Sequence, residues 1–231
     1  MTISSTNSVV FLMGPTASGK TELALEMYNQ LDASLISVDS ALIYRGMDIG
    51  TAKPSKVTLE NYPHALIDIC EPDESFSVNQ FVSLAKQHIE SALNAGKLPI
   101  LVGGTSFYFN ALEHGLSKLP ESTKDSRKYF NDRLKNQGSE KLHSQLLKID
   151  PTSATRIHPN DSQRVTRALE VFHLSGVTLS ELQGNKNENK LNHEIKKIIL
   201  MPERSELHQR IEKRFIEMIK DGFLDEVETL R

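Results

Sequence analysis

The fold of this chain follows from eight consecutive residues, Gly14-Pro15-Thr16-Ala17-Ser18-Gly19-Lys20-Thr21. They follow the short apolar run Val9–Met13, which predicts a buried strand, and they lead into a helical pattern that continues to about Leu31. The spacing fits G-x-x-x-x-G-K-[ST], a phosphate-binding loop (P-loop) between a strand and a helix. Backbone amides and the helix N-terminus attract phosphate oxygens, Lys20 adds a mobile charge, and the Thr21 hydroxyl is placed to ligate Mg²⁺. We expect the loop to bind a di- or triphosphate; a glycine turn without a ligand is the alternative.

Further apolar runs predict strands at Leu35–Val38, Leu66–Cys70 and Leu98–Val102. Helical patterns separate them, and Ser77 with Gln80 forms a capping-box pattern that opens one of these helices. Strands that alternate with helices predict an α/β fold with a buried parallel sheet.

The pattern changes near residue 117. From there the sequence predicts helices at 125–137, 139–149 and 161–176, and a polar loop over 184–194, without a buried strand. Strand character returns at 198–202, and an amphipathic helix follows, whose apolar stripe Leu207, Ile211 and Phe215 we interpret as core packing. We therefore predict a P-loop NTPase-like core of residues 1–116 and 199–231, with a helical insertion at 117–198.

The charge is distributed unevenly along the chain. The formal net charge of −3 over 231 residues argues by itself against a nucleic acid partner. Divided by segment, residues 1–116 carry −6 (6 basic, 12 acidic), 117–198 carry +5 (15 and 10) and 199–231 carry −2 (6 and 8). The predicted insertion is therefore a basic segment within an acidic chain.

The sequence also predicts a cytoplasmic protein without a membrane partner. No apolar run reaches 18 residues, and no basic residue precedes the first apolar run, so we expect neither a spanning helix nor a signal peptide. The single cysteine, Cys70, cannot form an internal disulfide, which favours a reducing compartment.

Two polar groups follow predicted strands. Asp39 comes after the second strand, and Gly103-Gly104-Thr105 follow the fourth. Because ligands of parallel sheets bind beyond the carboxyl ends of the strands, we expect both groups to meet the P-loop in one crevice. A carboxylate there can hold Mg²⁺ through water or act as a general base. A turn or helix-capping aspartate and a plain strand-to-helix turn are the alternatives.

Arg164 and Arg167 lie one helical turn apart, so they share a face of a predicted helix. Paired arginines on a basic insertion suit phosphate or base contacts, whereas a solvated helix face is the alternative. Arg127 on an earlier helix is equally open to both interpretations. The eight histidines show no spacing typical of a zinc site.

Several segments, in order over nearly the whole chain, resemble the bacterial tRNA dimethylallyltransferase family. The resemblance implies transfer of a dimethylallyl group from dimethylallyl diphosphate to the exocyclic amine of adenosine 37, next to the tRNA anticodon, with release of diphosphate. It is carried by Gly14–Thr21 (GPTASGKT), Asp39–Pro54 (DSALIYRGMDIGTAKP), Pro63–Pro72 (PHALIDICEP), Gly103–Leu112 (GGTSFYFNAL), His158–Gly176 (HPNDSQRVTRALEVFHLSG) and Arg210–Val227 (RIEKRFIEMIKDGFLDEV).

The resemblance also implies residue roles. Asp39 is then the general base, Thr105 lies by the reacting adenine, and Arg214 joins the P-loop in holding the diphosphate, with Mg²⁺ at Thr21. We expect a monomer that binds dimethylallyl diphosphate and the anticodon stem-loop of tRNA. The tRNA contacts implied are Asp39, Ser40, Ala41, Leu42, Thr105, Arg127, Gln163, Arg164, Val165, Thr166 and Arg167.

The chain departs from the family pattern in two respects. Ser106 stands where the family usually has glycine, and family members are longer, so we expect the natural chain to continue past Arg231. Two other functions are compatible with the motifs. One is a P-loop kinase whose insertion closes over ATP and whose Arg164 and Arg167 clamp phosphates. The other is a non-catalytic RNA-binding module with a vestigial P-loop.

Overall fold

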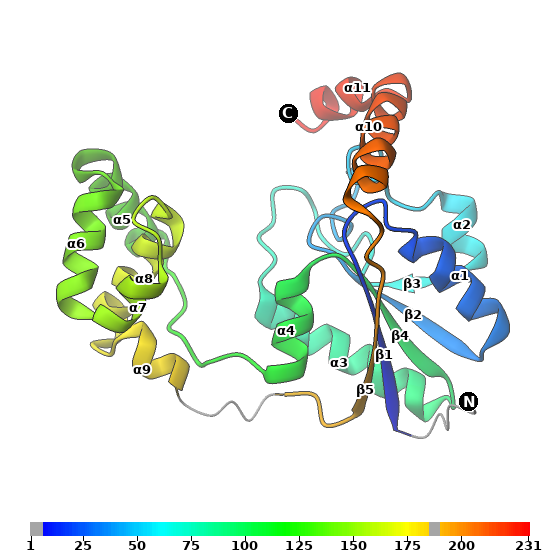
Figure 1. Ribbon diagram of the computed structural model, residues 1–231, viewed down its shortest axis with the longest axis horizontal. Coiled ribbons are helices and arrows are strands. Elements are labelled where there is room, and N and C mark those ends of the chain that lie inside the picture. Colours follow the sequence, from blue (N-terminus) through cyan, green and yellow to red (C-terminus); the bar gives the residue numbers. More distant parts are fainter. Residues whose placement is uncertain (1–6, 185–189) are drawn as a thin grey trace. The chain divides into compact units, whose positions relative to one another are not determined.

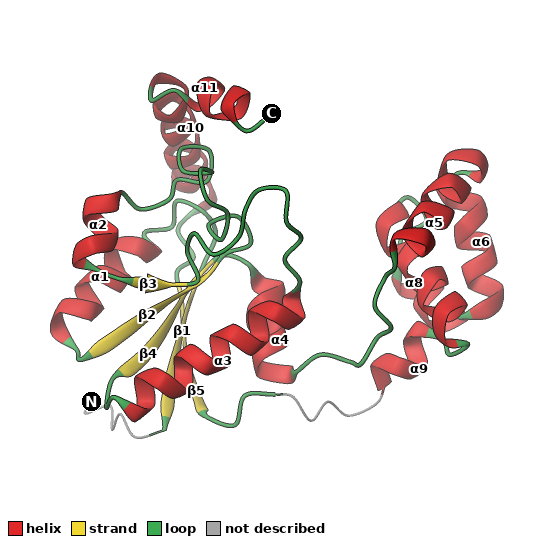
Figure 2. Ribbon diagram, turned by 180° about the vertical axis from the view of Figure 1, so that it is seen from behind, coloured by secondary structure: helices red, strands yellow, loops and turns green. Residues whose placement is uncertain are grey.

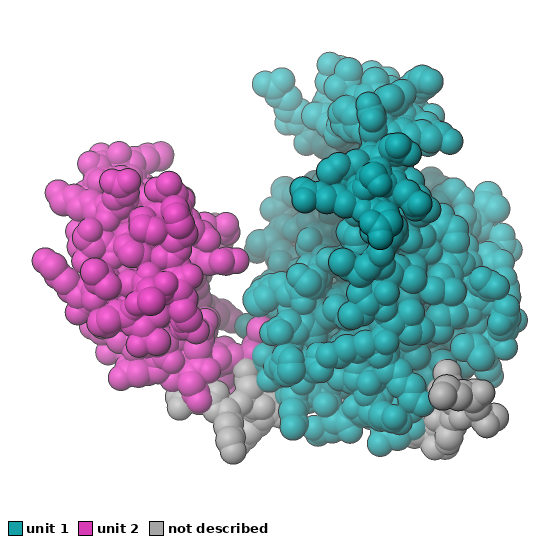
Figure 3. All heavy atoms as spheres, viewed as in Figure 1, with its two compact units in different colours: residues 1–115, 189–231 teal, residues 116–188 magenta. Residues whose placement is uncertain are grey.

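The computed structural model describes residues 7–184 and 190–231, so most of the polar loop predicted at 184–194 lies outside the described residues. The chain divides into two compact units, residues 1–115 with 189–231 and residues 116–188 (Figure 3). The second unit ends earlier than the predicted boundary at 198. The reason is that Glu194–Ile199 form a strand of the first unit, β5.

The first unit contains a parallel sheet of five strands (Figure 2). In chain order these are β1 (Ser8–Met13), β2 (Ala33–Val38), β3 (His64–Ala65), β4 (Leu98–Gly103) and β5. Their spatial order is β3-β2-β4-β1-β5, so the strand before the P-loop lies between β4 and β5. The predicted α/β fold class with a parallel sheet is confirmed.

The helices of this unit flank the sheet or follow its last strand (Figure 1). The box predicted at Ser77 and Gln80 is formed, with the Ser77 hydroxyl accepting from the Gln80 amide and the Gln80 side chain accepting from the Ser77 amide. The helices are α1 (Lys20–Gln30), α2 (Lys56–Asn61), α3 (Val78–Asn94), α4 (Ser106–His114), α10 (Arg204–Lys220) and α11 (Phe223–Thr229).

Helices cover both faces of the sheet because successive strand residues point to opposite sides. Val10 and Leu12 of β1 pack in one cluster with Ala24 of α1. Phe11, between them in sequence, points the other way and meets Phe109 of α4, with ring centroids 5.0 Å apart. All five side chains are essentially inaccessible to solvent, so the P-loop rises from a rigid, doubly covered strand.

The predicted third strand at Leu66–Cys70 is wrong. The strand β3 covers only His64 and Ala65, and Leu66 and Asp68 have left-handed backbones with φ of 67° and 55°. Two such residues cannot continue an extended strand. The segment turns instead, and the Cys70 amide donates to the Ile43 carbonyl at 3.0 Å. The predicted return strand at 198–202 is displaced as well, because β5 ends at Ile199.

The prediction that the apolar stripe of α10 packs in the core is also wrong for the part of the chain that the structure describes. Ile211 and Phe215 are 37% and 54% exposed, and no residue of α10 is buried. In Figure 1 the helix projects beyond the carboxyl end of the sheet and does not lie on a sheet face. No helix among the described residues is long and apolar enough to span a membrane.

The second unit is helical and has its own core. Phe130, Leu142, Leu146, Val165 and Leu169 form the centre of that core, each at most 4% exposed. No strand occurs among its described residues. Its helices are α5 (Lys124–Gln137), α6 (Ser139–Ile149), α7 (Pro151–Arg156), α8 (Ser162–Ser175) and α9 (Leu179–Gly184).

Candidate active site

A cavity of about 570 Å³ lies at the carboxyl ends of the central strands of the first unit. Residues 16–21 of the P-loop, Asp39 and Gly103-Gly104 all line it, so the three expected groups meet there, but Thr105 is not among the lining residues. A parallel sheet places its ligand site at this edge. The full lining comprises Thr16, Ala17, Ser18, Gly19, Lys20, Thr21, Glu22, Ser37, Asp39, Leu42, Thr51, Ala52, Pro54, His64, Ile67, Val102, Gly103, Gly104, Arg210 and Arg214.

Close backbone packing shapes the phosphate loop and the turn beside it. A Cβ on Gly14 would lie 2.6 Å from the Leu200 carbonyl oxygen, and one on Gly103 would lie 2.0 Å from the Val38 carbonyl oxygen. Only glycine fits at either point. Gly19, with φ of 90°, caps the N-terminus of α1, so the unpaired amides and the positive dipole end of that helix face the cavity.

Three cationic residues line the cavity, Lys20, Arg210 and Arg214. Lys20 donates from Nζ to the Pro15 carbonyl at 2.5 Å and to the Ser18 hydroxyl at 3.3 Å. Arg214 of α10 donates from Nη1 to the Thr16 hydroxyl at 3.0 Å. Partial burial lowers the pKa of Lys20 and of Arg214, and the Asp39 carboxylate opposes that shift in each. Positive charges that are partly removed from water attract an anion more strongly, so the cavity favours the binding of an anion.

Asp39 has one oxygen fixed and one available. Its Oδ1 accepts from the backbone amides of Ala41 at 2.8 Å and Leu42 at 3.3 Å. Its Oδ2 has no hydrogen bond to any residue that the structure describes. The Thr105 hydroxyl accepts from the Ser40 amide at 3.1 Å, which ties the turn after β2 to the turn after β4. The backbone thus holds the carboxylate in place through Oδ1 and leaves Oδ2 as an unused acceptor.

Left-handed residues other than glycine gather around this cavity. Among the described residues they are Ala17, Ala52, Leu66 and Asp68, with φ between 52° and 67°. Ala17 and Ala52 line the cavity, and the other two flank Ile67, which also lines it. Such conformations cost of order 1–3 kcal/mol each, so their clustering points to a functional site.

Sequence reasoning missed several lining residues. His64 is half-buried, and its Nδ1 contacts the Tyr62 carbonyl oxygen at 2.7 Å. Burial lowers the pKa of His64, so the ring is neutral near pH 7. Arg210 stands one helical turn before Arg214, a spacing that could have predicted their shared face. Nothing in the side-chain chemistry of Thr51 and Ala52 predicted that they line the cavity, although both lie in the segment Asp39–Pro54 that resembles the family.

Ser37 is the lining residue with the clearest unmet polar group. Its side chain is 3% exposed, and its hydroxyl has no hydrogen-bond partner in the described structure. Polar groups buried in this way are costly unless a partner is found. The hydroxyl is therefore an unsatisfied polar group directly beneath the surface of the cavity.

The predicted tRNA residues of the second unit fall into two groups. Arg127, Gln163 and Arg164 are exposed, and the Arg164 side chain is 75% exposed although its Nε lies 3.4 Å from Asp161. Val165 is fully buried in the core of the unit, so its side chain is not available to RNA. The Thr166 hydroxyl donates to the Ser162 carbonyl at 2.7 Å.

Arg167 is engaged within the second unit. Its Nη1 donates to Glu170 at 2.6 Å and to the Ser122 hydroxyl at 2.7 Å, and its Nη2 donates to the Pro120 carbonyl at 2.6 Å. Glu170 is buried, and burial would raise its pKa, but hydrogen bonds from Ser122, Ser126 and Arg167 lower it overall. Arg167 therefore neutralises a buried carboxylate, a structural role that its position on the helix did not reveal.

The oxygen donors of the cavity suit a hard cation. The Thr21 hydroxyl and the carboxylates of Glu22 and Asp39 all line it. No group of three or more His, Cys, Asp or Glu side chains in the described ranges could hold a metal ion. The Thr21 hydroxyl with the neighbouring Glu22 carboxylate fits Mg²⁺, which keeps several waters and takes further oxygens from a bound diphosphate.

The family model "IPP transferase" matches residues 42–231. The chain belongs to the IPP transferase family. It is 63% identical over its whole length to the tRNA dimethylallyltransferase of Ruthia magnifica subsp. Calyptogena magnifica, of which it covers 75%. It is 51% identical, over 98% of its length, to the tRNA dimethylallyltransferase of Alkalilimnicola ehrlichii, of which it covers 71%.

Solved structures of IPP transferase relatives have the same architecture. The full-length tRNA isopentenylpyrophosphate transferase from Bacillus halodurans is 39% identical, with a TM-score of 0.65 over 97% of this chain and 70% of that one. A eukaryotic dimethylallyltransferase acting on tRNA is 28% identical, with a TM-score of 0.77 over 97% of this chain and 56% of that one. These relatives confirm the P-loop NTPase-like fold predicted for the family.

Ser37 and Ser126 form a matched pair for a stability measurement, because both are buried but only Ser126 has partners. The Ser126 hydroxyl donates to Glu170 at 2.5 Å and accepts from the Thr123 amide at 3.0 Å. We expect Ser126→Ala to lower the free energy of unfolding by about 1–3 kcal/mol, and Ser37→Ala to leave it unchanged or slightly raised. Urea-induced unfolding checks both. A larger loss for Ser37→Ala would show that its hydroxyl already has a partner within the protein.

Proposed function

We propose that this chain transfers a dimethylallyl group from dimethylallyl diphosphate to the exocyclic amine of adenosine 37 of tRNA, with release of diphosphate. One observation carries the proposal. A single cavity holds a P-loop, three cationic residues and a carboxylate with a free oxygen, which are the groups that the departure of an anionic leaving group and the removal of a proton require.

The donor binds through its diphosphate. The amides of Ala17 to Thr21, the ammonium of Lys20 and the guanidinium of Arg214 surround the phosphate oxygens. As the bond between C1 of the prenyl group and its bridging oxygen breaks, both electrons leave with the diphosphate. The same cations stabilise the charge that develops there. A nucleoside triphosphate has the same phosphate chemistry, but the named relatives transfer a prenyl group.

The acceptor is an exocyclic adenine amine, a poor nucleophile until its proton has an acceptor. The amine nitrogen forms a bond to C1, and its proton passes to Oδ2 of Asp39. The amides of Ala41 and Leu42 hold Oδ1, so the carboxylate does not turn as it takes up the proton. Thr105 fixes the neighbouring Ser40. The adenine must leave its stack to reach such a site.

A magnesium ion would be held by the Thr21 hydroxyl and the diphosphate oxygens. When bound, it would neutralise part of the charge on the leaving diphosphate. This leaves Asp39 free to accept the proton.

The helical unit supplies charge for the RNA. Residues 116–188, which form this unit, carry +3 (12 basic and 9 acidic residues), and the exposed Arg127, Gln163 and Arg164 offer contacts to the backbone of an anticodon stem-loop. The proposal includes a monomeric enzyme that acts in the cytoplasm, where its tRNA substrate is found.

The two alternative functions, a P-loop kinase and a non-catalytic RNA-binding module, both lose support, because the relatives named above are prenyltransferases.

Replacement of Asp39 by asparagine tests the proposed base. The amide oxygen of Asn can still accept from the Ala41 and Leu42 amides, so the loop geometry is kept while the proton acceptor is lost. We expect Asp39→Asn to reduce kcat for prenylation by about 10²–10⁴-fold. The dissociation constant for tRNA, measured by filter binding, should change little. Turnover near the wild-type rate would remove Asp39 as the base.

A second pair of variants separates RNA contact from structural support. Arg164→Ala should weaken tRNA binding and make the plot of log K against log salt shallower by about one unit, because one phosphate contact is lost. Its melting temperature should match that of the wild type. Arg167→Ala should instead lower the free energy of unfolding by about 2–3 kcal/mol, because the buried Glu170 loses its counterion. An unchanged salt slope for Arg164→Ala would contradict the phosphate contact.

A further inference from the structure

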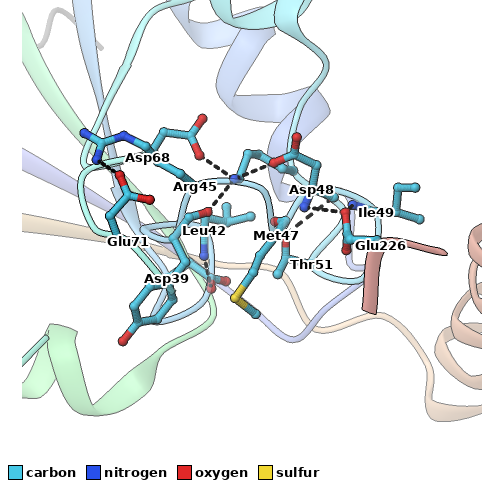
Figure 4. Close-up of polar contacts among 12 residues, drawn as sticks. Asp39, Leu42, Arg45, Met47, Asp48, Ile49, Thr51, Asp68, Glu71 and Glu226 are labelled. Atoms are coloured by element: carbon cyan, nitrogen blue, oxygen red, sulfur yellow. Dashed lines mark hydrogen bonds and ion pairs between the residues drawn. The ribbon is translucent and has the colours of Figure 1, made fainter. Parts of the chain in front are cut away.

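The carboxylate of Glu226 in α11 accepts hydrogen bonds from three consecutive backbone amides that are far from it in sequence (Figure 4). Its Oε2 accepts from the Asp48 amide at 2.7 Å and the Ile49 amide at 2.6 Å. Its Oε1 accepts from the Gly50 amide at 2.9 Å. Three successive amides that point at one carboxylate form an anion-binding nest, and hydrogen bonds to an ionised acceptor are the stronger kind.

The rest of α11 packs against the same segment, residues 46–50. A Cβ on Gly50 would lie 2.3 Å from the ring of Phe223, so only glycine allows this approach. A Cβ on Gly46 would lie 3.7 Å from the Leu230 side chain, which is ordinary contact. Phe223 at the start of α11 and Leu230 just after its end therefore both contact this segment, and Glu226 binds it between them.

Residues that follow this segment directly line the cavity. Thr51, Ala52 and Pro54 belong to its wall, and the Thr51 carbonyl accepts from Nη2 of Arg214 at 3.3 Å. Arg214 thus joins the P-loop, through Thr16, to the residues next to Gly50. A shift of residues 48–50 would move both the cavity wall and one partner of the arginine that faces the diphosphate.

An internal ion pair network supports the segment from its other side. Lys53 has a side chain only 3% exposed, and it donates to Asp48 at 2.6 Å, to Asp68 at 2.5 Å and to the Tyr44 carbonyl at 2.7 Å. Lys53 is local to the segment, whereas Glu226 supplies the hydrogen bonds that connect residues 48–50 to α11.

We infer that Glu226 is a positioning residue of the diphosphate site, which holds residues 48–52 so that Thr51, Ala52 and Arg214 meet the prenyl diphosphate. The inference rests on the proposed function for the identity of the ligand. Burial would raise the pKa of Glu226, but the three amide hydrogen bonds outweigh burial and lower that pKa. The carboxylate is therefore ionised at neutral pH.

Glu226→Gln is the sharpest test, because it keeps the shape of the side chain. One amide oxygen can still accept from Asp48 and Ile49, but the NH₂ group then faces the Gly50 amide, donor against donor. Glu228→Gln is the matched control, since Glu228 lies on the same helix, is exposed, and its side chain has no hydrogen bond or ion pair to any residue that the structure describes. Glu226→Ala removes the contact entirely.

The measurements are calorimetric binding of dimethylallyl diphosphate with Mg²⁺, hydrogen exchange of the amides of residues 48–50, steady-state kinetics and melting temperature. For Glu226→Gln we expect Kd and KM for dimethylallyl diphosphate to rise roughly five- to tenfold, kcat to change less than about twofold, and amide exchange to quicken. Glu226→Ala should show larger effects in the same direction. Glu228→Gln should behave as the wild type.

Two results would overturn the inference. One is a Kd for Glu226→Gln equal to that of the wild type, and the other is a loss of kcat alongside a lower melting temperature with KM unchanged, which would make Glu226 merely structural. If the wild type binds the diphosphate but does not prenylate RNA, the proposed function fails while the binding comparison still decides the role of Glu226. If the wild type does not bind it, both fail.

Discussion

The site must hold strong negative charge at the carboxyl edge of a parallel sheet, and the placement of its other groups depends on this electrostatic constraint. The N-terminus of α1, Lys20 and Arg214 supply the positive field, and their partial burial makes that field effective. The close approaches at Gly14 and Gly103 bring the P-loop and the neighbouring turns near enough to share one cavity. Asp39 lies in the same field, so one carboxylate balances the cations and remains available as a base.

The segment after Asp39 shows how the fold sustains this arrangement. It contains the left-handed Ala52, a buried lysine at position 53 and a nest of amides that holds Glu226. Strained backbone of this kind persists only where the surroundings fix it. Here the fixing contacts come from α10 and α11, helices whose apolar residues lie largely exposed. Their contribution to the first unit is local to the site: it is polar through Arg214 and Glu226, and apolar where Phe223 packs against Gly50.

Much of this was predictable from the sequence. The P-loop spacing, the apolar runs of β1, β2 and β4, and the charge reversal after residue 116 are local properties, and they predicted the α/β core, the crevice and a basic helical segment. The turn at Leu66–Asp68 was not predictable, because an apolar run does not reveal left-handed residues. Neither was the split between the exposed Arg164 and the engaged Arg167, since adjacent turns of one helix give no sign of a buried partner such as Glu170. Long-range contacts such as Glu226 with residues 48–50 leave no pattern in the sequence at all.

The central claim is that the P-loop binds a prenyl diphosphate and that the leaving group is diphosphate. The most direct measurement offers the protein dimethylallyl diphosphate and γ-labelled ATP together, with Mg²⁺ and an unmodified anticodon stem-loop, and follows the RNA by mass spectrometry and the label by chromatography. The account predicts that the RNA gains one isoprenoid unit at adenosine 37 and that no labelled phosphate is transferred. Transfer of phosphate to any acceptor, with no change in the mass of the RNA from prenylation, would contradict it.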